Sequence, residues 1–140
     1  MTQVTAPHLH VAAVVQRGDD LLLVRRGVGA AAGEWDVPGG AVSLGETMAE
    51  AVVRTFAHET GHDDVLCGPF LGWSEVIDDE APGRHRVVLY FTAVLMDGEP
   101  GGSPSAAEVD WVPVWTVPEL RLRDGLAEFL ADQELIDTVV

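Results

Sequence analysis

The chain has 140 residues, of which 47% are hydrophobic and 22% charged, and its formal net charge is −15. This length suits one domain that buries its own core, and the composition is that of a globular chain, not a disordered one. The acid surplus argues against general nucleic-acid binding, because it repels a phosphate backbone. A small phosphate ligand would need a bound divalent metal ion or local arginines to reverse the field at its site.

The sequence also bears on the compartment. No apolar run approaches the roughly 20 residues that a membrane-spanning helix needs, and residues 1–10 lack the basic start and apolar stretch of a secretory signal. The single Cys67 cannot form an internal disulfide bond, which is typical of a reducing compartment. We therefore expect a cytoplasmic protein with no membrane partner.

Hydrophobic patterning predicts strands over residues 9–16, 21–26, 65–76, 86–96 and 111–115. The RGDD segment between the first two suits a hairpin. Amphipathic helices are predicted over residues 47–60 and 124–132, and Gly61 stands where a left-handed cap residue is common. Segments 78–83 and 98–107 are predicted loops. Strands before, between and after the helices indicate an α/β or α+β fold in a single domain, residues 1–140.

The most informative stretch is residues 35–62, WDVPGGAVSLGETMAEAVVRTFAHETGH. Gly39 and Gly40 let the backbone adopt unusual dihedral angles or come close to a ligand. The amphipathic helix that follows carries acids on its polar face. Carboxylates grouped in this way suit Mg²⁺ or Mn²⁺, which prefer oxygen ligands.

Particular side chains of this helix are placed to act together. Arg54 and His58 lie four residues apart and share one face, and Glu59 lies about 100° round the helix from His58. Glu46 precedes the first turn, from where it can form an ion pair with Arg54 across the junction of loop and helix.

This segment resembles the Nudix box, G-x5-E-x7-R-E-U-x-E-E-x-G-U, in which U is a bulky apolar residue. Six positions match at the right spacing, namely Gly40, Glu46, Arg54, Phe56, Glu59 and Gly61. The segments WDVPGG, LLLVRR, RHRVVLYFTA and EVDWVPVWTVPEL are similar to the family as well. The resemblance covers nearly the whole chain, with the box at residues 40–62, and implies a Nudix-like α/β/α sandwich with a mixed β-sheet.

Three box positions depart from the family pattern. Thr55 and His58 stand where the family has glutamates, and His62 stands where it has an apolar residue. In the family these two glutamates and the one at position 59 hold divalent ions, so only Glu59 survives of the three. The departures predict weaker Mg²⁺ binding and slower turnover, and His58 suits a softer ion such as Mn²⁺ or Zn²⁺.

The resemblance therefore implies a set of roles. Glu59 is the expected catalytic residue, and Glu46 and Arg54 orient the loop and the helix. Glu59 and His58, together with Gly39, are the expected ligands of Mg²⁺ or Mn²⁺.

The family's usual reaction is hydrolysis of a diphosphate linked to another moiety. Water attacks phosphorus, while metal ions neutralise the phosphoryl oxygens and activate the water. We therefore expect metal-dependent hydrolysis of a small nucleotide: a nucleoside triphosphate, ADP-ribose or a nucleotide sugar. The lost acids leave a second hypothesis, a Nudix-like domain that senses a nucleotide without cleaving it. Family members are often dimers, so the resemblance also allows a homodimer.

A rival pattern overlaps the box. His58, Glu59 and His62 fit the H-E-x-x-H signature of zinc peptidases. Gly61 disfavours this interpretation because glycine is a poor residue inside a helix, and a helix that ends there turns His62 away from His58. A zinc peptidase is therefore a remote alternative.

Residues outside the box complete the expected site. Arg25 and Arg26 end a predicted strand, and the resemblance implies that one of them contacts a substrate phosphate through its forked donors. Arg84 begins the only other basic cluster, and Trp73 is the preferred stacking partner for a base. With Gly40, these four form the expected substrate-binding set, although each also suits a purely structural role.

Acids elsewhere are candidates to replace the lost box glutamates. They share a position in predicted loops or at their edges, and they are Glu75, Asp78, Asp79, Glu80 and Glu108. The competing interpretation is that they are solvated surface acids.

Overall fold

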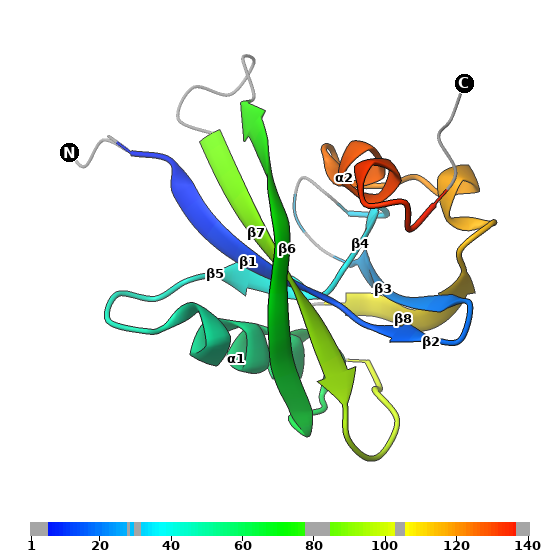
Figure 1. The fold of residues 1–140 in the computed structure, drawn as a ribbon, viewed down its shortest axis with the longest axis horizontal. Coiled ribbons are helices and arrows are strands. Elements are labelled where there is room, and N and C mark those ends of the chain that lie inside the picture. The colour runs from blue at the N-terminus through cyan, green and yellow to red at the C-terminus, as the bar shows by residue number, and fades with distance from the viewer. Residues whose placement is uncertain (1–5, 28, 30–31, 78–84, 103–105, 137–140) are drawn as a thin grey trace.

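Two β-sheets lie between two helices in the computed structural model, which describes residues 6–27, 29, 32–77, 85–102 and 106–136 (Figure 1). The strands are β1 (His8–Val14), β2 (Gln16–Arg17), β3 (Asp20–Arg26), β4 (Trp35–Asp36), β5 (Gly39–Ala41), β6 (Val65–Ile77), β7 (His85–Leu95) and β8 (Ala106–Pro113). The helices are α1 (Met48–Thr60) and α2 (Leu126–Asp132), with a 3-10 turn, η1 (Val117–Glu119), before α2.

The first sheet has the order β5-β1-β7-β6 and is mixed, because β1 and β7 run parallel while its other neighbours are antiparallel. In the second sheet, β3 pairs antiparallel with β2, β4 and β8. Arg17 lies opposite Asp20 across the turn between β2 and β3, which confirms the hairpin predicted from RGDD.

The strands β1 and β3 are buried on both faces, which explains their nearly continuous apolar runs. On β1, Val11 and Ala13 pack into a core that includes Phe56 of α1, whereas Ala12 and Val14 pack into a second core that includes α2. Because successive side chains of a strand point to opposite faces, one strand serves both cores. The predicted α/β/α sandwich with a mixed sheet is therefore confirmed.

Helix α1 begins and ends where the sequence predicts. The Thr47 hydroxyl accepts a hydrogen bond from the Glu50 backbone N–H, and the Glu50 carboxylate accepts one from the Thr47 N–H. Gly61 ends the helix with φ of 70°, a left-handed conformation that favours glycine.

The last strand differs from the prediction over residues 111–115, which was wrong in its bounds. Strand β8 runs from Ala106 to Pro113, and Trp115 lies beyond it with an exposed side chain. The beginning of β8 falls in the predicted loop 98–107, while the predicted loop 78–83 lies outside the described residues.

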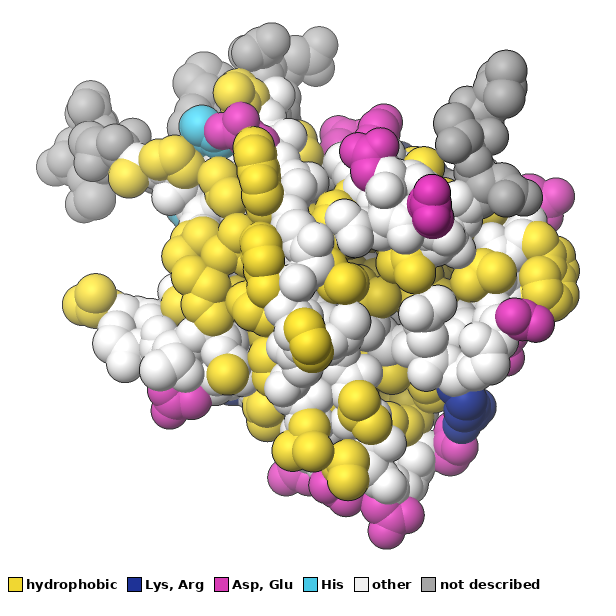
Figure 2. Space-filling model, viewed as in Figure 1, with side chains coloured by type: hydrophobic (Ala, Val, Ile, Leu, Met, Phe, Trp, Pro, Cys, Tyr) yellow, Lys and Arg dark blue, Asp and Glu magenta, His cyan; other side chains and the backbone are white. Residues whose placement is uncertain are grey.

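The surface reflects the composition. Figure 2 shows acidic side chains around the edge of this face, few basic ones, and apolar side chains gathered over β6 and β7. The large exposed apolar side chains there include Leu66, Phe70, Trp73 and Val94. No helix among the described parts of the chain is long and apolar enough to cross a membrane.

Candidate functional site

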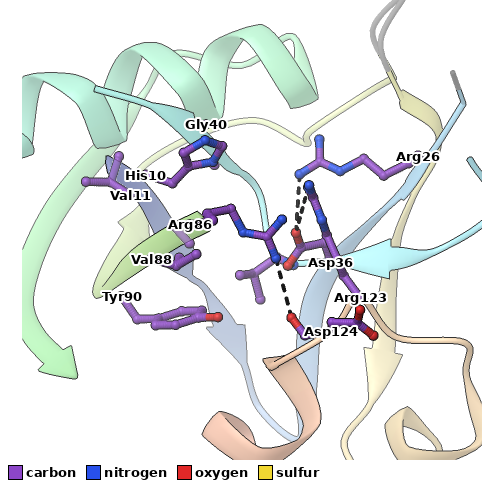
Figure 3. A pocket seen from close by; sticks show the side chains of 13 residues that line it. His10, Val11, Arg26, Asp36, Gly40, Arg86, Val88, Tyr90, Arg123 and Asp124 are labelled. Atoms are coloured by element: carbon purple, nitrogen blue, oxygen red, sulfur yellow. Dashed lines mark hydrogen bonds and ion pairs between the residues drawn. The ribbon is translucent and has the colours of Figure 1, made fainter. Parts of the chain in front are cut away.

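A pocket opens where β1, β3, β4, β5 and β7 meet the segment before α2 (Figure 3). Its charged and titratable lining residues are His10, Arg26, Asp36, Arg86, Tyr90, Arg123 and Asp124. Three of these are arginines, in a chain with only eight basic residues. We call it the arginine pocket. Its volume of about 20 Å³ holds about one water molecule, so a larger ligand enters only if the lining side chains move.

Arg26, at the end of β3, lies between two carboxylates. Its Nη1 donates to Oε1 of Glu59, and its Nη2 donates to Oδ2 of Asp36 at 3.4 Å. Asp36 also lies 3.7 Å from Nη1 of Arg123. Burial alone would lower the pKa of Arg26, but the charges of Asp36 and Glu59 outweigh burial and raise that pKa. Arg26 is therefore a permanent cation of this site.

Strand alternation separates Arg26 from its neighbour. The Nε of Arg25 lies 3.4 Å from Oε1 of Glu108 on β8, and both side chains are substantially exposed. Successive strand side chains face opposite ways, and only Arg26 lines the pocket. Of the two candidates for the phosphate contact, the structure thus places Arg26 at the pocket. The candidate acid Glu108 lies next to Arg25 instead.

Arg86 and Arg123 reach the pocket from β7 and from the segment before α2. Nη2 of Arg86 donates to the backbone carbonyl of Asp124 at 3.4 Å, and Arg86 forms no ion pair with any residue that the structure describes. Burial lowers the pKa of Arg123; Asp36 opposes this, while the positive charges of Arg86 and Arg26 add to it. Neighbouring guanidinium groups of this kind favour an anion between them.

His10 lines the same pocket from β1. Burial, followed by the charges of Arg86 and Arg123, lowers the pKa of His10 to about 4. His10 is therefore neutral near pH 7 and offers a hydrogen bond without adding positive charge.

Glu59, in the last turn of α1, is 2% exposed. Besides the bond from Arg26, its Oε1 accepts a hydrogen bond from the Gly39 N–H at 3.4 Å. A Cβ on Gly39 would lie 2.2 Å from the Val11 carbonyl oxygen, and one on Gly40 would lie 3.1 Å from Cγ2 of Thr55. Because these residues are glycines, β5 can lie close to both β1 and α1. Gly39 and Gly40 line the pocket, so the pocket lies beside the end of α1 that carries Glu59.

The predicted ion pair between Glu46 and Arg54 is confirmed. The Arg54 Nε lies 2.6 Å from Oε2 of Glu46, and the Arg54 Nη2 donates to the Ala41 carbonyl at 2.7 Å. Oε1 of Glu46 accepts a hydrogen bond from the Ser43 N–H at 3.0 Å. The pair therefore ties the loop between β5 and α1 to the helix.

The substituted box positions do not converge on a metal. Thr55 is buried and its hydroxyl donates to the Ala51 carbonyl at 2.7 Å, while His58 is exposed. His62 lies beyond the end of α1, so it does not share a helical face with His58, as the zinc-peptidase pattern requires. Within the described ranges, no group of three or more His, Cys, Asp or Glu side chains could hold a metal ion.

The remaining predicted residues lie elsewhere. Trp73, on β6, is 61% exposed and lines a groove of about 570 Å³ between β6 and α2. The groove shares Asp124 with the arginine pocket, but Trp73 does not line that pocket. The carboxylate of Glu75 lies 2.6 Å from Nε2 of His85. Asp78, Asp79, Glu80 and Arg84 lie outside the described residues.

Sequence reasoning did not single out Asp36, Arg123 or His10 as residues of the site. Asp36 stands inside the WDVPGG segment, whose similarity to the family could have marked it as a candidate site residue. Arg123 stands in LRLRD, where alternating charges are equally typical of a surface segment.

Known proteins resemble this chain over most of its length. Residues 6–133 match the family model described as NUDIX domain. The putative 8-oxo-dGTP diphosphatase 2 of Mycobacterium tuberculosis is 31% identical over 133 residues, covering 84% of this chain and 91% of that protein.

Solved structures share the fold. The MutT protein from Methanosarcina mazei superposes with a TM-score of 0.81 at 23% identity, over 94% of this chain and 96% of that one. The NUDIX domain of Shewanella oneidensis NrtR, in complex with ADP ribose, has a TM-score of 0.69 at 23% identity, over 94% of this chain and 86% of that one.

Proposed function

Because this chain belongs to the Nudix family, we propose that it hydrolyses a nucleoside diphosphate-linked compound whose phosphates bind at the arginine pocket. The substrate class comprises nucleoside triphosphates, ADP-ribose and nucleotide sugars. The observation that carries the proposal is the convergence of Arg26, Arg86 and Arg123 beside Gly39 and Gly40, which lead into the box helix. The cytoplasmic location and the homodimer stay predictions.

The arginines supply what phosphate chemistry needs in an acidic protein. A guanidinium group binds two phosphoryl oxygens through parallel N–H donors. As water attacks phosphorus and the anhydride P–O bond breaks, these donors neutralise the charge on the phosphoryl oxygens. One further donor is unused, because the buried Nε of Arg26 has no hydrogen-bond partner within the described ranges. The names of the relatives point to 8-oxo-dGTP and ADP ribose as ligands of those proteins, and both ligands contain a diphosphate.

The box residues fit a divalent ion poorly, although members of the family generally use one. Mg²⁺ and Mn²⁺ take several oxygen ligands. Of the three box positions that carry metal-binding glutamates in the family, only Glu59 keeps a carboxylate, and Arg26 is paired with it. The proposed hydrolysis therefore relies on the arginines to neutralise the phosphoryl oxygens. The dependence on Mg²⁺ or Mn²⁺ that the family resemblance implies is not part of this proposal, and it is tested by comparing EDTA with each metal.

Binding without hydrolysis is the second candidate function. It is favoured by the same ion pair, because the one acid that the family resemblance makes catalytic is buried and engaged by Arg26. Such a domain would keep the pocket and respond to a nucleotide without cleaving it.

One experiment separates the two candidates. The purified chain is incubated with a panel of nucleoside triphosphates, ADP-ribose and nucleotide sugars, in EDTA, Mg²⁺ or Mn²⁺, and the products are resolved by chromatography. Thermal-shift binding of the same panel runs in parallel. Product release establishes the hydrolase, whereas a thermal shift without product selects the binding domain.

Arg86→Gln tests whether the pocket is the site. A charge-assisted hydrogen bond contributes about 1.5–3 kcal/mol, so we expect affinity or kcat/KM to fall about 10- to 100-fold. Arg121→Gln is the matched control, because Arg121 is exposed, stands near Arg123 in the sequence and does not line the pocket. Equal losses in the two variants would refute the assignment of the pocket.

A further inference from the structure

We infer that the guanidinium group of Arg26 takes the place of a divalent ion at Glu59, so that the arginine pocket binds the phosphates of its ligand without metal. The class of ligand is taken from the proposed function. The role of Arg26 is independent of that function, because it follows from the contacts of the Arg26 side chain.

Glu59 is buried at the end of α1. Its side chain is 3% exposed, and a carboxylate so far from water needs an opposite charge beside it. Arg26 provides that charge with its own side chain 16% exposed, and Asp36, 17% exposed, holds the other side of the same guanidinium group. Since a guanidinium group keeps its proton in proteins, the charge of Glu59 is compensated without a metal ion.

A divalent ion would compete with Arg26 for the Glu59 carboxylate. A divalent ion at Glu59 would lie beside a guanidinium group of like charge, and at this depth such repulsion is weakly screened. The ion would have to displace Arg26 and then find further oxygen ligands. Thr55 does not supply one, because it is 4% exposed and its hydroxyl already donates to the Ala51 carbonyl.

Positive charge remains in the arginine pocket for a ligand. Asp36 is shared between Arg26 and Arg123, whereas among the described residues Arg86 has only the long contact to the Asp124 carbonyl. Figure 3 shows the guanidinium groups of these arginines gathered on one side of the pocket around Asp36. Oxygens of a diphosphate placed between Arg86 and Arg123 would supply the acceptors that these donors lack.

The role of Arg26 is tested on the wild-type chain with Mn²⁺ alone. A paramagnetic ion broadens nearby amide resonances, so ¹H–¹⁵N spectra are recorded during a Mn²⁺ titration. We expect no selective broadening at Gly39 and Glu59, and any broadening to fall on exposed acids. Early and selective broadening at Gly39 and Glu59 would overturn the inference without reference to any substrate.

The variant Arg26→Gln serves as the positive control for the Mn²⁺ titration. In Arg26→Gln, loss of the competing cation should let Mn²⁺ broaden Gly39 and Glu59 at lower concentrations than in the wild type. The circular-dichroism spectrum and the melting temperature check that the variant is folded. A folded Arg26→Gln chain that responds to Mn²⁺ just as the wild type does would contradict the exclusion of the ion by Arg26.

Metal-free binding is tested by calorimetric titration with inorganic pyrophosphate, in EDTA and in Mg²⁺. We expect binding in EDTA that Mg²⁺ does not strengthen, weakened tenfold or more by Arg86→Gln and unchanged by Arg121→Gln. Binding that appears only with Mg²⁺ would overturn the inference and leave the proposed function intact. No binding in either condition would refute the phosphate-binding pocket of the proposed function, and metal-free binding with it.

Discussion

The carboxylate of Glu46 joins the loop before α1 to the helix itself. Its hydrogen bond with Arg54, followed by the one from the Ser43 backbone, lowers the pKa of Glu46 to about 2 from an ordinary value of 4.5. A carboxyl group whose pKa is lower in the folded state stabilises the fold fully above its unfolded pKa. This contribution falls as the pH drops below about 4.5 and is lost by about pH 2.

Glu46→Gln should therefore lose stability in a pH-dependent way. We expect the difference in unfolding free energy between wild type and variant to be constant near neutral pH and to shrink as the pH falls from about 4.5 towards 2. Urea denaturation at a series of pH values measures this difference. Glu119→Gln, at an exposed position of η1, is the control for losing an acid. A difference that does not vary with pH would mean that the Arg54 bond is not formed in solution.

The sequence predicts one of the two ion pairs, Glu46–Arg54, but not the other, Arg26–Glu59. Glu46 and Arg54 are eight residues apart within one motif, so spacing alone indicated their contact. Arg26 and Glu59 are 33 residues apart and meet only because β3 lies beside the end of α1 in the folded chain. No local pattern distinguishes a buried arginine at a strand end from an exposed one, as the contrast between Arg26 and Arg25 shows.

Helix α1 carries the second part of the box, and its cap at Thr47 fixes where the helix begins. The Thr47 hydroxyl satisfies the Glu50 N–H, one of the backbone donors that a helix start leaves without a partner. Thr47→Ala should therefore lower the unfolding free energy by about 1 kcal/mol, while Thr47→Ser should retain most of it. Urea denaturation compares the three chains, and an equal loss in both variants would point to packing of the threonine methyl group instead.

At the level of elements, the sequence predicted what local patterns determine. The amphipathic stripe and Gly61 located α1, and apolar runs located β1, β3, β6 and β7. Strand β8 was misplaced because the segment before Asp110 is rich in alanine and glutamate, which are weak strand formers. That segment is a strand because it pairs with β3, where Glu108 lies opposite Arg25. The parallel pairing of β1 with β7 likewise depends on the whole fold.

For the whole molecule, the charge distribution decides where an anion can bind. The net charge of −15 disfavours phosphate over most of the surface. Folding gathers arginines from β3, β7 and the segment before α2 into one pocket, where a phosphate meets several donors. The net charge predicted that a phosphate site would need local arginines or a metal ion. Which arginines form the cluster could not be predicted, because they come from segments that only the tertiary structure brings together.

The same charge predicts how the melting temperature responds to salt. Like charges on the surface repel one another and destabilise the compact state, and about 0.15 M salt shortens their range to about 8 Å. We therefore expect NaCl to raise the melting temperature, with a relief of about 1 kcal/mol shifting it by about 4 °C. Buried pairs such as Arg26–Glu59 are screened less, so they should not reverse the trend.

Pyrophosphate at fixed ionic strength should raise the melting temperature further, because a ligand that binds the folded state stabilises it. Arg86→Gln separates the two effects, since it should keep the response to NaCl and lose most of the response to pyrophosphate. Differential scanning calorimetry measures both. A melting temperature that falls with NaCl would mean that exposed ion pairs such as Arg17–Glu99 outweigh the general repulsion. A pyrophosphate response that survives in Arg86→Gln would place the anion outside the arginine pocket.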